Sequence, residues 1–126
     1  MSTIRADVVQ NATGGATTLT DLYPAKAWAV YDQYTTQTLL DSSAVSSIAD
    51  LGVGKTRVTF SNPFSSANYC VAGTLGGGGS QNAGGGAICF DMSPATVPTT
   101  THSDVDSFIA ANGNRDFNYN SVIFTA

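Results

Sequence analysis

The sequence contains no glutamate, and its positive charge is limited to two lysines and three arginines among 126 residues. A helical protein of this length normally carries many Glu and Lys on its exposed faces, because both residues favour helices and keep the surface soluble. Their scarcity argues against helices. The polar residues are instead mainly hydroxyls, with 16 Thr and 13 Ser, which suit strands and turns.

The chain also lacks a basic surface. Its net charge is −4 and its isoelectric point is about 4.4, which argues against binding to a nucleic-acid backbone. No apolar run approaches the roughly 20 residues that span a bilayer. The opening residues 1–5 lack the apolar stretch of a secretion signal, so we expect the chain to be made in a cytoplasm and to insert into no membrane.

Metal and cofactor chemistry has little support in the residue types present. His102 is the only histidine, and with Cys70 and Cys89 it does not give a usual metal-ligand spacing. Cys70 and Cys89 flank a glycine-rich segment symmetrically, so a disulfide between them is one alternative. Two buried thiols in a reducing cytoplasm are the favoured alternative.

Three aspartates offer a second alternative for a metal site. Asp104 and Asp106 alternate along one predicted strand face and would lie near Asp116 across a hairpin, where they could bind Ca²⁺. Solvated carboxylates are the commoner reading. No residue lies at a spacing that suggests an acid–base pair, so we predict no enzyme, no catalytic residue, no metal and no cofactor.

Short alternating segments separated by turns predict an antiparallel β-sandwich, of jelly-roll or immunoglobulin-like type. An extended N-terminal arm is expected over residues 1–22 and a single sandwich domain over residues 23–126. Turns are marked by Gly52-Val53-Gly54, Asn62-Pro63 and Asn112-Gly113-Asn114, the last as a hairpin between Ile109 and Phe117. Strands are predicted near residues 26–32, 36–41, 44–50, 55–61, 67–74, 86–92, 103–110 and 117–125.

Alternation within these strands also predicts the core, because one parity of each strand faces inward. Replacing Trp28 by Ala is therefore expected to cost about 3 to 5 kcal/mol. The predicted core residues are Trp28, Val30, Leu40, Ile48, Val58, Phe60, Val71, Ile88, Phe90, Phe108, Val122 and Phe124.

Two regions are candidates for contacts with other molecules. In the arm, Ile4, Val8 and Val9 indicate a segment that pairs with a neighbouring subunit by adding a strand. Residues 73–86 contain eight glycines, which indicates either a mobile loop or a tip that orders on a partner. The exposed-loop candidates are Ser80, Gln81, Asn82, Asn112, Gly113 and Asn114.

The first 75 residues contain, in order, AKAW at 25–28, VSSIADLG at 45–52, an alternating strand that ends at Phe60, and SSANYCV at 65–71. These four segments resemble a module of tail-fibre and other virion structural proteins of tailed bacteriophages. In that family the order is approximately AKAWVNF, NVSSITDNGTG, YTVNF and PDANYCV. Residues 2–7 also resemble the start of such proteins, and Ser121-Val122-Ile123-Phe124 resembles the closing strand more loosely. The matching positions are Trp28, Val45 to Ile48, Asp50, Gly52, Phe60 and Ala67 to Val71.

The resemblance implies a non-enzymatic virion protein, and it favours a tail fibre or tail appendage that contacts a host surface glycan or protein. The short chain favours the alternative of a capsid decoration protein, a cement or head-fibre protein that stabilises the shell. A carbohydrate-binding module is a third alternative, with fewer aromatics than expected. Both phage alternatives imply other virion proteins, of tail or capsid, as partners, and a symmetric oligomer, most simply a homotrimer.

Overall fold

The computed structural model of the chain describes residues 25–77, 86–91, 93, 97–109 and 113–126. The predicted arm over residues 1–22 lies outside the described residues, as does most of the glycine-rich segment. Within the described ranges the regular structure consists of strands, and no helix is present. The all-β expectation is therefore confirmed.

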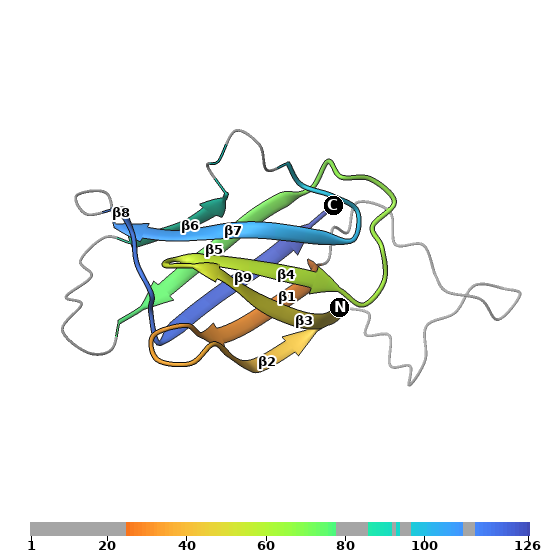
Figure 1. Ribbon diagram of the computed structural model, residues 1–126. Coiled ribbons are helices and arrows are strands. Elements are labelled where there is room, and N and C mark those ends of the chain that lie inside the picture. Colours follow the sequence, from red (N-terminus) through yellow and green to blue (C-terminus); the bar gives the residue numbers. More distant parts are fainter. Residues whose placement is uncertain (1–24, 78–85, 92, 94–96, 110–112) are drawn as a thin grey trace, which may run out of the picture.

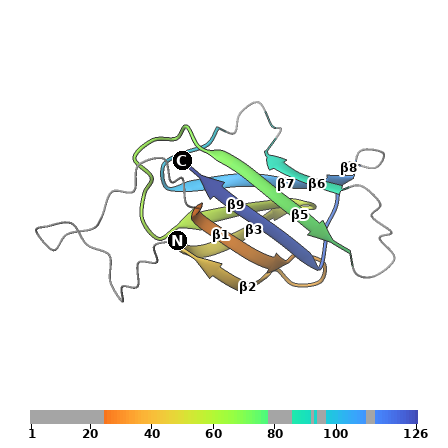
Figure 2. The ribbon, with the colours of Figure 1, turned by 180° about the vertical axis from the view of Figure 1, so that it is seen from behind.

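The strands form two antiparallel sheets that pack face to face, as Figures 1 and 2 show from opposite sides. The predicted β-sandwich is thus confirmed. The first sheet has the order β2 (Thr38–Ser43), β1 (Ala25–Asp32), β9 (Tyr119–Thr125), β5 (Cys70–Gly76). The second has the order β3 (Val45–Gly52), β4 (Lys55–Phe60), β7 (His102–Ile109), β6 (Gly86–Phe90), and the short β8 (Gly113–Asn114) also pairs with β7.

The chain passes from the first sheet to the second through one residue. Ala44 separates β2 from β3 and has a positive φ of 56°, a conformation uncommon for a residue with a side chain. Its carbonyl accepts a hydrogen bond from the Ser61 amide at 3.0 Å, which ties this corner to the end of β4. The corner fixes where the two sheets meet at this edge of the sandwich.

The turn at residues 52–54 joins β3 to β4 as predicted. Gly52 and Gly54 have φ values of 125° and 68°, which glycine adopts without strain. Gly54 is also required by close packing, since a Cβ there would lie 2.5 Å from the Ser107 carbonyl oxygen. The turn therefore packs directly against β7.

Aromatic rings fill one half of the space between the sheets. Phe60 stacks on Phe64 with ring centroids 4.2 Å apart and meets Tyr69 and Phe124 edge-on at 5.7 and 5.0 Å. Tyr69 also contacts Phe90 at 5.8 Å. Such pairs add about 0.5 to 1.5 kcal/mol each beyond the buried area, so this cluster anchors the two sheets to each other.

The predicted core is confirmed for most strands but wrong for β1 and β2. On β1 the buried side chains are Ala27, Ala29 and Tyr31, so Trp28 and Val30 lie on the opposite, outer face. Both parities of this strand are apolar, and alternation alone could not choose between them. Small alanines at 27 and 29 leave room for the large rings of the opposing layer, which explains the outcome.

The remaining differences in the core are smaller. Leu40 is 48% exposed, because a register shift in the β1–β2 pairing turns Leu39 inward in its place. The prediction for Phe108 is also wrong, because Phe108 has the parity of Asp104 and Asp106 on the outer side of β7 and is only half-buried, whereas Val105 and Ile109 face the core. Val58, Phe60, Ile88, Val122 and Phe124 are buried as predicted, and Ile48, Val71 and Phe90 pack against them.

The predicted hairpin between Ile109 and Phe117 is wrong in its second strand. Ile109 pairs with Gly113 and Phe108 with Asn114, so the returning strand is the two-residue β8. The chain then crosses to the first sheet, where β9 begins at Tyr119. Hydrogen bonds divert it: the Asp116 carboxylate accepts the Gly54 amide at 2.7 Å, and the Phe117 carbonyl accepts the Gln33 amide at 2.9 Å.

Strand boundaries otherwise follow the sequence within a few residues. The largest difference is in the segment predicted at 67–74, where the strand starts only at Cys70. Tyr69, just before it, uses its ring in the aromatic cluster and its hydroxyl donates to the His102 carbonyl at 3.1 Å. The residues before Cys70 therefore cross between the layers instead of extending a sheet.

Candidate functional site

The outer face of the first sheet carries an apolar surface. Ladder pairing places Trp28 of β1 beside Ile123 of β9, and Ile123 beside Ala72 of β5. Ile123 is 45% exposed, although it is a large aliphatic residue in the middle of a sheet. We call this surface the Trp28 face and define it by its outward residues: Trp28, Val30, Ala72, Thr74, Ser121 and Ile123.

Two shallow grooves run along the Trp28 face on either side of Ile123. One, of about 310 Å³, is lined by residues that include Trp28, Val30 and Ser121. The other, of about 210 Å³, is lined by Ala72, Gly73, Thr74 and the same Ser121. Ile123 contributes to both, so it forms a ridge between two grooves, and no charged side chain lines either of them.

The outer face of the second sheet is built differently. Arg57 on β4 lies opposite Asp104 on β7, and its Nε and Nη2 donate to the two carboxylate oxygens at 2.7 and 2.8 Å. Lys55 lies opposite Asp106, with 3.6 Å between Nζ and Oδ1, and donates to Asp91 at 2.7 Å. We call this surface the ion-pair face; its residues are Lys55, Arg57, Asp91, Asp104 and Asp106.

These pairs hold both basic groups in their charged form. The hydrogen bond to Asp91 raises the pKa of Lys55, and that to Asp104 raises the pKa of Arg57. Asp104 and Asp106 are buried, while Lys55 and Arg57 keep about a third of their side chains exposed. Asp104 and Asp106 are therefore neither the solvated carboxylates nor the calcium ligands considered from the sequence, and Asp116 is bonded to the Gly54 amide.

The two cysteines lie on different outer faces. Cys70 begins β5 on the side of the Trp28 face and is exposed, whereas Cys89 on β6 lies opposite Asp106 on the ion-pair face. Both are free thiols, so the disulfide alternative is wrong. The reason is topological, since β5 and β6 belong to different sheets. Burial, and then the charges of Asp106 and Asp91, raise the pKa of the Cys89 thiol.

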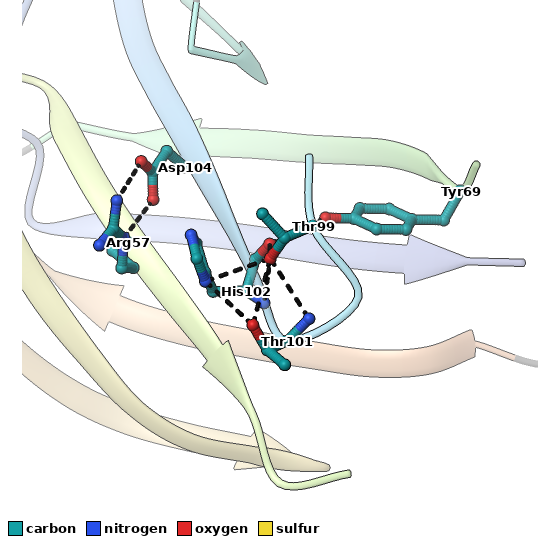
Figure 3. A network of polar contacts seen from close by, with 6 residues as sticks. All are labelled: Arg57, Tyr69, Thr99, Thr101, His102 and Asp104. Atoms are coloured by element: carbon teal, nitrogen blue, oxygen red, sulfur yellow. Dashed lines mark hydrogen bonds and ion pairs between the residues drawn. The ribbon is translucent and has the colours of Figure 1, made fainter. Parts of the chain in front are cut away.

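A hydroxyl–imidazole cluster lies at the start of β7, and Figure 3 shows it beside the Arg57–Asp104 pair. Thr99 Oγ1 lies 3.1 Å from Nδ1 of His102, and the hydroxyl of Thr101 lies 3.2 Å from the same nitrogen. Thr99 Oγ1 also accepts the His102 amide at 3.0 Å and donates to its carbonyl at 2.9 Å. The contacts close a tight turn, while both oxygens of Asp104 are occupied by Arg57.

A polar cluster is buried between the sheets at the end away from the aromatic rings. Asn120 donates to the carbonyls of Tyr31 and Phe117 at 3.2 and 2.9 Å, and accepts the Ser107 hydroxyl at 3.0 Å. Burial raises the pKa of Tyr31 to about 12, despite the nearby hydroxyls of Thr56 and Ser107, which lower it. This cluster links β1, β7 and β9 and fixes the crossing that leads into β9.

Few of the site residues predicted from the sequence can be placed. Gly113 and Asn114 form β8 rather than a free turn, and Gly113 is exposed. The other candidates, Ile4, Val8, Val9, Ser80, Gln81, Asn82 and Asn112, lie outside the described residues. Across the described ranges, no three His, Cys or acidic side chains gather closely enough to hold a metal ion.

Sequence reasoning missed the Trp28 face itself. The available signal was that residues 27–31 are apolar at both parities, which indicates a strand with two apolar faces. The same applies to Val122, Ile123 and Phe124 near the end of the chain. Assigning the larger side chains to the core hid this signal.

Comparisons with protein-family models, curated proteins and solved structures find no match to this chain. Among the described residues, no helix has the length and apolar character needed to cross a membrane.

Proposed function

We propose that this chain is a non-enzymatic structural protein of a tailed-bacteriophage particle, a tail fibre or tail appendage exposed toward the host surface. The observation that carries the proposal is the Trp28 face, an apolar surface on the outer side of three neighbouring strands of a sheet. Apolar patches of this kind mark surfaces that contact other proteins. An assembly protein needs such a surface.

The positions that resemble phage virion proteins support a shared scaffold. Phe60 and Tyr69 belong to the aromatic cluster, and the Asp50 carboxylate accepts the Gly52 amide at 2.8 Å to close the β3–β4 turn. These residues build the sandwich. Trp28 is the exception, because its side chain points outward and is free to contact a partner.

The charged groups described on the chain also suit a scaffold. Arg57 and Lys55 are bonded to aspartates across neighbouring strands, and His102 is bonded within its turn. Charge-assisted pairs of this kind resist local opening of the sheet. A protein that bears mechanical load on a particle benefits from such cross-strand ties.

Immunogold electron microscopy tests the proposal. Antibodies raised against the recombinant chain are applied to particles purified from lysates of the phage that encodes it, and the expected result is gold on the tail. Gold over the shell would overturn the tail assignment in favour of a capsid decoration protein. Antibody that labels no particle, although the chain is present in the lysate, would overturn the virion proposal altogether.

A further inference from the structure

We propose that the Trp28 face is a homotypic interface, covered in the assembled protein by the Trp28 face of a second copy of this chain. The inference goes beyond the proposed function, because it depends on the surface alone and applies whether or not the chain is part of a virus particle. The charge and the shape of the face favour this occupant, and its area sets how strong the contact can be.

The charge of the face favours a partner with a similarly uncharged surface. Trp28, Val30, Ile123 and Ala72 are apolar, and their neighbours Ser121 and Thr74 carry only hydroxyls. The one charged residue paired with the face is Asp41 on the edge strand β2, opposite Val30. A partner that brought charges onto this surface would have to desolvate them without a counter-charge, which is costly. The second sheet cannot serve as the partner surface, because Lys55 and Arg57 project from its outer side.

The shape of the face is complementary to itself. Ile123 stands as a ridge beside the groove of about 310 Å³ that Trp28 and Val30 line. A twofold axis lying between two such faces places the ridge of each copy in the groove of the other. Ile123 of each copy thereby fills the groove of the other copy, and the Trp28 side chain that lines the groove becomes enclosed.

The area of the face predicts a weak contact. Its three strands, about 4.8 Å apart and about seven residues long, cover roughly 14 by 23 Å, or about 320 Å² per copy. The pair buries about 640 Å², well below the roughly 1,200 Å² of most stable complexes. We therefore expect a dimer that dissociates on dilution. A face that meets itself closes a dimer, not the trimer that the sequence predicts, so the measured mass distinguishes the two.

The fluorescence of Trp28 provides a direct test, because it is the only tryptophan in the chain. Emission of the full-length protein is recorded over a dilution series, with molar mass measured in parallel by sedimentation. The expected result is a red shift and increased acrylamide quenching on dilution, at the same concentrations at which the mass falls from dimer to monomer.

A matched pair of variants locates the contact. Ile123→Lys puts a charge on the ridge and should keep the protein monomeric, with Trp28 exposed at every concentration. Leu51→Lys is the control: Leu51 is 42% exposed, close to the 45% of Ile123, but lies on β3 in the second sheet. It should dimerise like the unmodified chain. Circular dichroism checks that both variants are folded.

Three results would overturn the inference. The first is a monomer at all concentrations, whether Trp28 is exposed throughout or shielded throughout by the chain's own remaining residues. The second is an oligomer that Ile123→Lys leaves intact. The third is a trimer, because a face that meets its own copy across a twofold axis closes a dimer.

Discussion

The two outer faces of the sandwich are built from the same kind of strand but completed in opposite ways. On the second sheet, Arg57 and Lys55 alternate with buried residues and are bonded to aspartates on neighbouring elements. On the first sheet, Trp28 and Ile123 alternate with buried residues, and their direct cross-strand partners are apolar or hydroxyl side chains. One aspartate, Asp41, lies on the same side, opposite Val30 on the edge strand β2. The paired charges of the second sheet suit a surface that contacts water. The exposed apolar residues of the first sheet are typical of an interface with another protein.

This difference shows where a chain with few charges places them. All the charged groups of the ion-pair face come from three neighbouring strands or their immediate ends: β4, β7 and the residue after β6. The six residues of the Trp28 face carry no charge, and Asp41 lies at its edge on β2. The few charged side chains are therefore distributed unevenly over the two outer faces. The face without them is the one that we assign to assembly.

The largest expected effect comes from comparing the two sides of the first sheet. Phe124→Ala removes a fully buried ring from the aromatic cluster and should cost about 3 to 5 kcal/mol. Trp28→Ala removes a half-buried ring from the outer face and should cost the monomer about 1 kcal/mol. Urea unfolding of dilute protein measures both. Equal losses would mean that Trp28 belongs to the core after all.

Alkaline pH tests the inner side of β1, which carries Tyr31. The unfolded tyrosine ionises near pH 10 and the folded one only near pH 12, so stability should fall as the pH rises through this window. The loss reaches about 2 to 3 kcal/mol at the top of the window. The raised pKa of Lys55 adds a loss in the same direction above pH 10.5.

Tyr31→Phe should remove the tyrosine's part of that alkaline loss. The matched control is Tyr119→Phe, because Tyr119 is 60% exposed on the first sheet and its hydroxyl meets water before and after unfolding. Unfolding curves between neutral pH and pH 12 compare the three proteins. A Tyr31→Phe variant that loses as much stability as the unmodified chain would contradict the assignment.

A smaller effect is expected when the ion-pair face is broken. Arg57→Ala leaves the buried Asp104 carboxylate without its two hydrogen bonds and should cost about 2 kcal/mol, less than a fully buried pair because Arg57 is partly exposed. Arg57→Lys keeps the charge but loses the two parallel hydrogen bonds, so its loss of stability should lie between zero and that of Arg57→Ala. Thermal unfolding at low and high salt measures these losses; an unchanged midpoint for Arg57→Ala would refute the prediction.

The smallest effect concerns reactivity and leaves stability unchanged. Cys70 is exposed, whereas Cys89 is half-buried and its pKa is raised by burial and by the nearby aspartates. A thiol reagent should therefore label Cys70 faster than Cys89 near neutral pH. Mass spectrometry after timed labelling, with Cys70→Ser and Cys89→Ser as single-site controls, measures the two rates. Faster labelling of Cys89 would run against the expected difference between the faces.

Much of the fold could be predicted from local pattern. The turn at Gly52-Val53-Gly54 was predictable because glycine there relieves backbone strain, and Val58 and Phe60 were predictable as core because their neighbours on the strand are polar or charged. The hairpin after Ile109 was predicted with the wrong partner. The course of the chain after Ile109 depends on the hydrogen bonds of Asp116 with Gly54 and of Phe117 with Gln33. The partners in each bond are more than sixty positions apart, so no local pattern contains them.

The candidate site was much harder to predict. Arg57, Asp104, Lys55 and Asp106 become ion pairs only because β4 and β7 are neighbours in register, although 47 positions separate Arg57 from Asp104. The residues singled out for assembly, Ile4, Val8 and Val9, lie outside the described part of the chain, so that prediction stands as it was made. The Trp28 face was not predicted, because its two residues on β1, Trp28 and Val30, were assigned to the core.

The sequence by itself determined that this protein is built of strands and that apolar and polar residues alternate in most of them. It also determined that little charge is available to cover the surface. These properties depend on residues a few positions apart. Only the tertiary structure decided which apolar side of β1 is buried, because both sides qualify and the choice depends on how Ala27, Ala29 and Tyr31 fit the opposing layer. The side that packing did not use is the surface left for a partner.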